Sequence, residues 1–260
     1  MRSGPVQGEL WGRQPANWAG LMEPQARPLY EITLDALEPL AGARLLDAGC
    51  GAGLSLQIAA GRGARVSGLD ASAPLLEIAR TRTPGADLRV GDIEELPFEA
   101  STFDMVCAFN AIQYAVEPAA AVAELARVCR SGGRVAIGIW GEPARCETEA
   151  LFARLRALVP PPPGAPAPLV VSGTGMVEEL LEQAGLVVTG AGEVTCPFQF
   201  ADHDAAHAAH AAAGPVQKAI EVAGPDAVRS VLREVLEADR KPDGTLRQDN
   251  VFRYVVGAMP

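Results

Sequence analysis

Four short apolar runs in the first half of the chain each end in an acidic or amide side chain. The runs are "ARLLDA", "ARVSGLD", "ADLRVGD" and "TFDMVCAFN", at 43–48, 64–70, 86–92 and 102–110. Helix-like segments separate them, and strands that alternate with helices predict a parallel sheet covered on both faces. Ligands of such sheets bind outside the carboxyl ends of the strands, so the polar residues at these ends should lie close together. These residues are Asp47, Asp70, Asp92 and Asn110.

The remaining segments complete this architecture. Helical spacing of apolar residues predicts further helices at 30–40, 73–82, 118–130, 173–185 and over most of 202–240. Later strands are expected at 133–140, 186–198 and 250–258, with the last two antiparallel across the helical insertion between them. Ser72 is the expected N-cap of one helix, and Gly132 with Gly133 the expected end of another. We therefore predict an α/β fold with a Rossmann-like, doubly wound sheet of seven strands, six parallel and the last antiparallel.

The chain reads as one domain over 1–260. Its 260 residues, 48% of them hydrophobic, are enough to bury one large core. Within it we expect an N-terminal helical segment at 1–40, a ligand-binding core at 41–140 and a helical cap at 198–247. The stretch "VPPPPGAPAP", 159–168, cannot continue a helix or a central strand, because proline lacks the N–H and fixes φ. It is expected to be a surface loop.

Charge and cysteine usage exclude several classes of protein. The formal net charge is −10, so the surface repels phosphates and a nucleic-acid partner is not expected. The five cysteines are scattered without a CxxC pair, which favours free thiols in a reducing compartment. No apolar stretch approaches the ~18 residues of a membrane span. We expect a cytoplasmic protein without membrane insertion, as a monomer or a homodimer.

The turn after the first strand carries three glycines at alternate positions, in "LLDAGCGAGL", 45–54. Such a turn lets a ligand approach the backbone and turns N–H groups of the helix start toward it. A dinucleotide site would need G-x-G-x-x-G, but Leu54 and Leu56 stand where the third glycine would be. The sequence therefore disfavours a nicotinamide-dependent oxidoreductase, which remains as an alternative.

The order of four segments resembles the class I S-adenosylmethionine-dependent methyltransferases, in the group that includes the ubiquinone- and menaquinone-biosynthesis enzymes. The segments are "LLDAGCGAG", "VSGLDAS", "VGDIEELPFEASTFDMV" and "LARVCRSGGRVAIGIW", and the resemblance covers 30–140. It implies S-adenosyl-L-methionine as cofactor, S-adenosyl-L-homocysteine as product and no metal. It also implies methyl transfer to an O, N or C nucleophile of a small molecule, by in-line displacement.

The resemblance assigns cofactor contacts residue by residue. Asp70 would accept hydrogen bonds from the ribose hydroxyls, and Asp92 would receive the adenine amino group. Asp47 would anchor the turn or meet the ammonium group, and Asn110 would lie near the methyl group. The implied cofactor-binding residues are Asp47, Ala48, Gly49, Gly51, Gly53, Asp70, Ala71, Asp92, Ile93 and Asn110.

Two segments could cover the methyl acceptor, the N-terminal residues 9–30 and the insertion at 198–247. Aromatic residues are few, 5% of the chain, yet several stand near the expected site. The residues assigned to the lid or the acceptor side are Trp11, Trp18, Tyr30, Gln113 and Tyr114. Packing of the N-terminal segment onto the sheet would explain the aromatic ones equally.

All three histidines lie in "FADHDAAHAAHAAAG" and share one face of a helix. His203 and His207 have the spacing of a metal pair, but no Cys or Glu accompanies them nearby. An unperturbed histidine also suits a catalytic base near neutral pH. The candidate catalytic residues are therefore His203, His207 and Asn110, with His210 on the same face; a packing or solvated face is the alternative.

Competing functions stay open at this point. A protein with this fold and cofactor could rearrange a substrate without transferring methyl, and nothing in the sequence excludes it. Methylation of DNA bases is disfavoured, because "FNAIQY" replaces the N/D-P-P-Y motif expected after the fourth strand. A small-molecule methyltransferase, for example of secondary metabolism, is the leading prediction.

Overall fold

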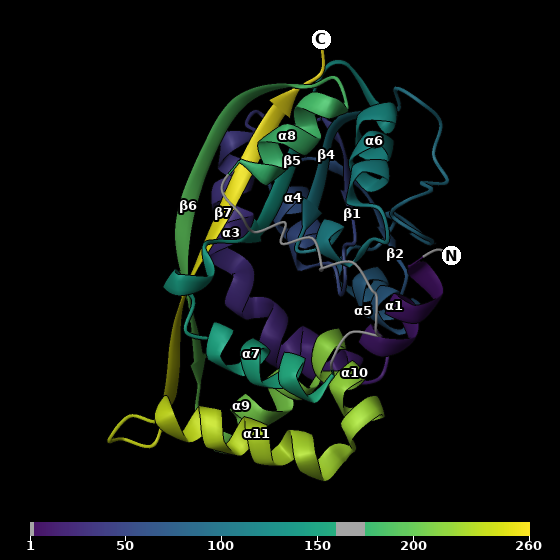
Figure 1. The fold of residues 1–260 in the computed structure, drawn as a ribbon. Helices are drawn as coiled ribbons and strands as arrows, with labels where there is room; N and C mark the ends of the chain where they lie inside the picture. Colours follow the sequence, from purple (N-terminus) through teal and green to yellow (C-terminus); the bar gives the residue numbers. More distant parts are fainter. Residues whose placement is uncertain (1–2, 160–174) are drawn as a thin grey trace.

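A computed structural model describes residues 3–159 and 175–260 of the chain (Figure 1). One sheet runs through it, in the strand order β3-β2-β1-β4-β5-β7-β6. The strands are β1 (Arg44–Ala48), β2 (Arg65–Asp70), β3 (Asp87–Val90), β4 (Phe103–Phe109), β5 (Cys129–Trp140), β6 (Val187–Phe200) and β7 (Leu246–Ala258). Only β7 is antiparallel, to both β5 and β6, so the predicted sheet with six parallel strands is confirmed. The order reverses between β1 and β4, which is where doubly wound sheets bind their ligands.

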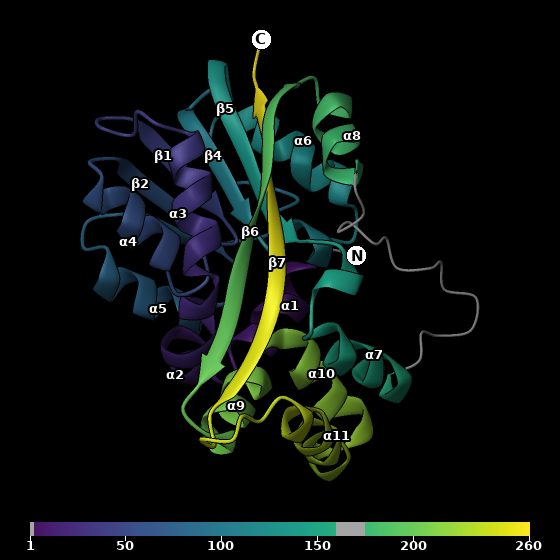
Figure 2. The same cartoon turned by 90° about the vertical axis from the view of Figure 1, so that its left-hand side faces the viewer.

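Helices cover the sheet on both sides (Figure 2). On one face lie α3 (Arg27–Ala36), α4 (Leu54–Gly61) and α5 (Ala73–Arg82), and on the other α6 (Pro118–Val128) and α8 (Met176–Gln183). Successive strand residues point to opposite faces, so Leu45 joins the core cluster under α3 to α5 and Leu46 the cluster under α6 and α8. Both side chains are buried, which explains why this strand reads as a continuous apolar run.

Two long strands connect the sheet to a helical cap. β6 and β7 pair from Val187 opposite Ala258 to Phe200 opposite Leu246, and Figure 2 shows them running from the sheet down to the cap. The predicted antiparallel pairing of these segments is therefore confirmed. The cap consists of α7 (Glu149–Leu158), α9 (His203–Ala211), α10 (Gly214–Ala223) and α11 (Pro225–Ala238). It gathers below the sheet in Figure 1, beyond the end of β5.

The N-terminal segment lies across the same side of the molecule as the cap. It contains α1 (Gly4–Trp11), α2 (Pro15–Asn17), a π-helical turn (Trp18–Met22) and a 3₁₀ turn (Glu23–Ala26). The helix predicted at 30–40 was shifted, because α3 begins at Arg27 and ends at Ala36. Pro39 accounts for this end, since the residue before a proline is disfavoured in helical conformation.

A second boundary was also wrong in the sequence prediction. The helix expected to continue to 130 ends at Val128, and Gly132 and Gly133 lie inside β5. The pairing of β5 with β4 shifts register between Cys129 and Arg134. A Cβ on Gly133 would lie 2.6 Å from Cys129 Sγ, so the glycines permit this irregular strand start and do not end the helix.

Four further features of the sequence can be compared with the structure. Ser72 caps α5, since its side chain accepts a hydrogen bond from the N–H of Leu75. All five cysteines are buried free thiols. Within the described ranges no helix is long and apolar enough to cross a membrane. The proline-rich segment lies, apart from Val159, outside the described residues.

Candidate active site

One cavity opens at the carboxyl ends of the central strands and continues beneath the cap. At its polar end lie Asp47, Gly51, Asp70 and Asn110, next to the glycine turn of residues 49–53. Aromatic side chains and one histidine line the other part, the aromatic end, namely Tyr30, Phe109, Trp140, Phe152, Phe198, His210 and Phe252. The space free of protein atoms, mouth included, is about 1320 Å³.

The three glycines of the turn have different reasons to be glycine. All have positive φ, at +87° for Gly49, +55° for Gly51 and +82° for Gly53. A Cβ on Gly49 would lie 2.4 Å from Ala111 Cβ, and one on Gly53 would lie 2.8 Å from Ala79 Cβ. These two glycines therefore let the segment after β4 and the helix α5 approach the turn. Of the three, Gly49 and Gly51 line the cavity, whereas Gly53 is the N-cap of α4 and lies outside it.

Asp70 holds the turn from the neighbouring strand. One carboxylate oxygen accepts the N–H of Gly51 at 2.8 Å and the other accepts the N–H of Ser72 at 2.8 Å. Burial raises the pKa of Asp70, and these two backbone hydrogen bonds oppose the rise. Each carboxylate oxygen has a second lone pair, so both can still accept a hydroxyl group from a ligand in the cavity.

Two acceptor oxygens at the polar end have no hydrogen-bond partner among the described residues. Asp47 accepts a hydrogen bond from Ser55 with Oδ2, but its Oδ1 is buried and unpartnered. Burial raises the pKa of Asp47 to about 7. Asn110 has the left-handed φ of +47° and a second buried, unpartnered Oδ1. Buried polar atoms are rarely left without partners, so these oxygens indicate a ligand with donor groups.

The N-terminal helix covers the place that the sequence assigned to adenine. Asp92 accepts the N–H of Gly4 at 2.6 Å and the hydroxyl of Ser3 at 3.3 Å. A Cβ on Gly8 would lie 2.2 Å from Ala71 O, so α1 also packs directly on the end of β2. Ala71 and Ile93 line the cavity, but Asp92 does not. In this arrangement Asp92 fastens α1, a role that the sequence did not predict.

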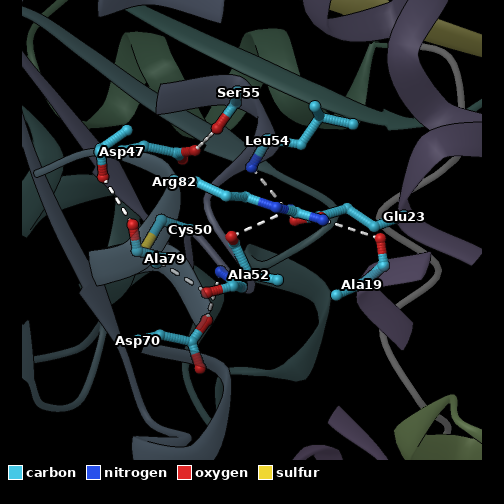
Figure 3. Close-up of polar contacts among 12 residues, drawn as sticks. Ala19, Glu23, Asp47, Cys50, Ala52, Leu54, Ser55, Asp70, Ala79 and Arg82 are labelled. Atoms are coloured by element: carbon cyan, nitrogen blue, oxygen red, sulfur yellow. Dashed lines mark hydrogen bonds and ion pairs between the residues drawn. The ribbon is translucent and has the colours of Figure 1, made fainter. Parts of the chain in front are cut away.

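A buried ion pair joins the N-terminal segment to the glycine turn (Figure 3). The Arg82 guanidinium donates to the carboxylate of Glu23 and to the carbonyls of Ala52 at 3.0 Å and Ala19 at 2.8 Å. Glu23 in turn accepts the N–H of Leu54 at 3.3 Å. Glu23 is only 3% exposed, and burial raises its pKa despite the neighbouring guanidinium. This cluster keeps the turn and its cover together.

The predicted lid residues divide between two places. Trp11 and Trp18 pack edge to face at 4.7 Å between ring centroids, and Tyr114 packs on Trp11 at 5.4 Å. These three line the cavity together with Tyr30, so packing and ligand contact are not exclusive. Trp18 Nε1 is a buried donor without a partner in the described chain. Gln113 lines an adjoining groove instead of the cavity.

Trp140 is the centre of the aromatic end. It is the last residue of β5 and packs against Phe252 at 4.3 Å, Phe152 at 5.5 Å and Phe198 at 5.7 Å between ring centroids. The four rings come from β5, β7, α7 and β6. They give this half of the cavity an apolar wall that no single segment of the sequence contains.

Of the three histidines, only His210 lines the cavity. It is 2% exposed, and its Nε2 lies 2.9 Å from Gln248 Oε1. Burial lowers the pKa of His210 to about 4, so the ring is neutral near pH 7. The catalytic candidates His203 and His207 do not line the cavity. Within residues 3–159 and 175–260, no cluster of three or more His, Cys, Asp or Glu could hold a metal ion.

The structure therefore brings together most of the predicted site. Eleven of the predicted cofactor, lid and acceptor residues line the cavity, namely Asp47, Gly49, Gly51, Asp70, Ala71, Ile93, Asn110, Trp11, Trp18, Tyr30 and Tyr114. The predicted residues outside it are Ala48, Gly53, Asp92, Gln113, His203 and His207. The sequence analysis did not predict the roles of Glu23 in the N-terminal segment and Arg82 in α5. Their opposite charges were the one indication that they could pair.

The core of the chain matches a known family. Residues 46–137 match the family described as a methyltransferase domain. The ubiquinone biosynthesis O-methyltransferase of Paracidovorax citrulli is 34% identical over 126 residues, which cover 44% of this chain and 53% of that protein. The chain thus spans about half the length of this curated relative.

Solved structures share the fold over most of the chain. Geranyl diphosphate C-methyltransferase from Streptomyces coelicolor, solved with S-adenosyl-L-homocysteine, has a TM-score of 0.54 and 16% identity over 90% of this chain and 79% of that one. The 4+2 cyclase SpnF has a TM-score of 0.59 and 19% identity over 90% of this chain and 82% of that one. At such identities the likeness shows a common fold alone.

Proposed function

We propose that this chain, which carries the core of a class I S-adenosylmethionine-dependent methyltransferase at residues 46–137, transfers the methyl group of that cofactor to a small molecule. The observation that carries the proposal is the polar end of the cavity. There, unpartnered oxygens, a positive-φ turn and a buried carboxylate lie at the switch point of the sheet.

The residues at the polar end fit the cofactor by their donor and acceptor groups. Asp47 and Asn110 offer two unpartnered acceptors for an ammonium group, and Trp18 Nε1 offers a donor for a carboxylate. Asp70 keeps a free lone pair on each oxygen for a ribose diol. An ammonium group beside Asp47 would lower the raised pKa of that carboxyl, because an opposite charge favours the ionised form.

The cofactor supplies an activated methyl group, which leaves alignment and exclusion of water to the protein. The N-terminal segment and the cap both line the cavity, the first with Trp18 and the second with Val216 of α10. Neutral and aromatic walls suit a reaction in which a positive charge disappears. Asn110, directly after β4 at the polar end, would orient the reacting groups.

Calorimetric titration with S-adenosyl-L-homocysteine tests the cofactor assignment. We expect binding, and we expect no binding of NAD or NADP under the same conditions. Formation of S-adenosyl-L-homocysteine from S-adenosyl-L-methionine, measured with a panel of hydroxy, amino and carbon acceptors, then tests methyl transfer. Tight binding of a nicotinamide nucleotide in place of S-adenosyl-L-homocysteine would overturn the proposal.

A second candidate function is a rearrangement in which the cofactor is bound but not consumed. The similarity to the 4+2 cyclase SpnF supports keeping it, since that protein has the same fold. Binding of S-adenosyl-L-homocysteine with no transfer to any acceptor of the panel would favour this function. The five buried free thiols support action in a reducing compartment, for which the cytoplasm is our proposal.

A further inference from the structure

We propose that the aromatic end of the cavity is a subsite for an uncharged, largely apolar acceptor that donates one hydrogen bond, from a hydroxyl group, to Nδ1 of His210. This inference rests on the proposed function and specifies its substrate class. It depends on three features of the described residues: the walls of the subsite, their lack of positive charge and the hydrogen bonds that set the histidine tautomer.

The walls of the subsite are apolar and come from every surrounding element. Trp140, Phe152, Phe198 and Phe252 form the ring cluster described above, and Val216 of α10 adds an aliphatic side chain. Such walls stabilise a flat or aliphatic molecule by burying its surface, at roughly 25 cal/mol per Å². These side chains offer few hydrogen-bond partners to a polar substituent of the acceptor.

No lysine or arginine among the described residues lines the cavity. The Arg82 guanidinium, nearby, is already engaged by Glu23, Ala52 and Ala19. A carboxylate or phosphate on the acceptor would therefore lie in an apolar space without a counter-charge, close to the carboxylates of the polar end. Burial of an unpaired charge is strongly unfavourable, so an anionic acceptor is excluded from this subsite.

A chain of hydrogen bonds sets the tautomer of His210. The carboxylate of Asp239 can only accept, so the Gln248 amide nitrogen, 2.8 Å away, donates to it. Gln248 Oε1 therefore faces His210 and also accepts the hydroxyl of Thr148 at 3.2 Å. Since Oε1 only accepts, the His210 proton must be on Nε2.

The same chain leaves Nδ1 as an acceptor. His210 is neutral, so a proton on Nε2 means a lone pair on Nδ1. No hydrogen bond of the described residues uses Nδ1, and the side chain lines the cavity. A hydroxyl that donates to Nδ1 keeps its own oxygen lone pairs free to face the polar end. His210 is thereby a positioning and specificity residue for an oxygen nucleophile.

Equilibrium dialysis with paired probes tests this subsite without requiring methyl transfer. The full-length protein, saturated with S-adenosyl-L-homocysteine, is tested with 2-naphthol, naphthalene and 2-naphthoate. We expect 2-naphthol to bind best, naphthalene about tenfold more weakly for lack of the hydrogen bond, and 2-naphthoate least. Failure of 2-naphthol to bind, or preference for 2-naphthoate, would overturn the proposal.

Variants of His210 separate its role from general packing. His210→Leu should abolish the preference for 2-naphthol over naphthalene, because the variant has no acceptor for the hydroxyl group of 2-naphthol. His210→Asn places an amide oxygen near the position of Nδ1 and should restore part of the preference. His207→Leu, outside the cavity, is the matched control and should keep it. An unchanged preference in His210→Leu would contradict the inference.

The two proposals fail in different ways. If S-adenosyl-L-homocysteine does not bind while 2-naphthol binds through His210, the subsite stands and the proposed function falls. If S-adenosyl-L-homocysteine binds and the hydroxyl preference does not depend on His210, the function stands and the subsite falls. Preference for 2-(aminomethyl)naphthalene over 2-naphthol would also overturn the subsite, since it would indicate a cationic acceptor held by aromatic faces.

Discussion

The polar end and the aromatic end of the cavity are held in place in different ways. At the polar end, backbone N–H groups of the glycine turn donate to the neighbouring strand, from Gly49 to the carbonyl of Leu69 and from Gly51 to the carboxylate of Asp70. At the aromatic end, side chains from β5, β6, β7 and the cap helices α7, α9 and α10 meet. The polar end depends on a short backbone turn and on the ends of neighbouring parallel strands, and the aromatic end depends on long-range packing of side chains.

This difference predicts which end tolerates change. A turn held by backbone hydrogen bonds has one geometry, so it suits an invariant cofactor. A wall of exchangeable apolar side chains adapts its volume by substitution, at little cost when volume is conserved. The Asp239–Gln248–His210 chain of hydrogen bonds fixes the orientation of one polar group, the His210 imidazole, at the aromatic end.

The largest effect is expected where the N-terminal segment is held to the polar end of the cavity. Arg82→Met leaves Glu23 buried without its partner and should lower the free energy of unfolding by about 3–5 kcal/mol. Urea unfolding measures this change. The double variant Glu23→Gln/Arg82→Met should recover much of the loss, and equal stability of the single and double variants would show that the ion pair does not couple the regions.

The next largest effect should show that the two ends bind their ligands independently. Asp70→Ala should weaken S-adenosyl-L-homocysteine binding by about 1–3 kcal/mol, the scale for losing hydrogen bonds to a charged group. Calorimetry gives the affinity, and Asp87→Ala, an exposed strand residue paired with Arg89, is the control. Because Asp70 lies outside the aromatic end, 2-naphthol should bind the variant unchanged. Unaltered cofactor affinity would remove Asp70 from the ribose assignment.

The two ends should also respond to pH with opposite signs. His210 has a folded pKa of about 4, below its usual 6.5, so its contribution to stability is lost as pH falls from about 6.5 to 4. Asp47 has a folded pKa of about 7, above its usual 3.8, so its contribution is lost as pH rises from about 4 to 7. From pH 7 to 5 each titration changes the free energy of unfolding by about 2 kcal/mol. The titration of His210 lowers it and that of Asp47 raises it.

Single variants should show how much each residue contributes to the pH dependence of stability. On going from pH 7 to 5, Asp47→Asn should lose about 2 kcal/mol more than the unsubstituted chain, and His210→Leu should lose about 2 kcal/mol less. Unfolding by urea at both pH values, without cofactor, measures the differences. Parallel pH profiles of the two variants would contradict the opposed titrations.

The smallest effect is expected from the turn itself. Gly51→Ala places a side chain at φ +55° without a clash, and should lower stability by about 1 kcal/mol. Gly42→Ala, at φ +78° in open space far from the cavity, is matched in strain. Only Gly51→Ala should also weaken S-adenosyl-L-homocysteine binding in calorimetry. Equal affinities in both variants would show that the ligand does not approach this part of the turn.

The polar end could be predicted from the sequence because its pattern is local. Each of Asp47, Asp70 and Asn110 follows an apolar run, and parallel strands bring such ends to one edge regardless of side-chain detail. The glycine spacing also identified the turn correctly. What it could not show is that Gly53 serves the contact with Ala79, since that depends on how closely α5 packs.

The aromatic end could not be predicted in the same way. Helical spacing correctly placed three histidines on one face, but which of them enters a cavity depends on how α9 lies against β6 and β7. Likewise, Glu23 and Arg82 are 59 positions apart, and nothing in either segment indicates the partner. The same holds for Gln248, whose role follows from Asp239 and His210 together.

The position of β7 between β5 and β6 has a consequence for the order of folding. β6 has no other neighbour in the sheet, so it cannot join until the last strand of the chain has been made. During synthesis from the N-terminus, β1 to β5 can pair early, while residues 187–200 wait for residues 246–258. Contacts so far apart in sequence form slowly, because the intervening loop must close first. The polar end can therefore form on the nascent chain, and the wall that selects the acceptor is completed last.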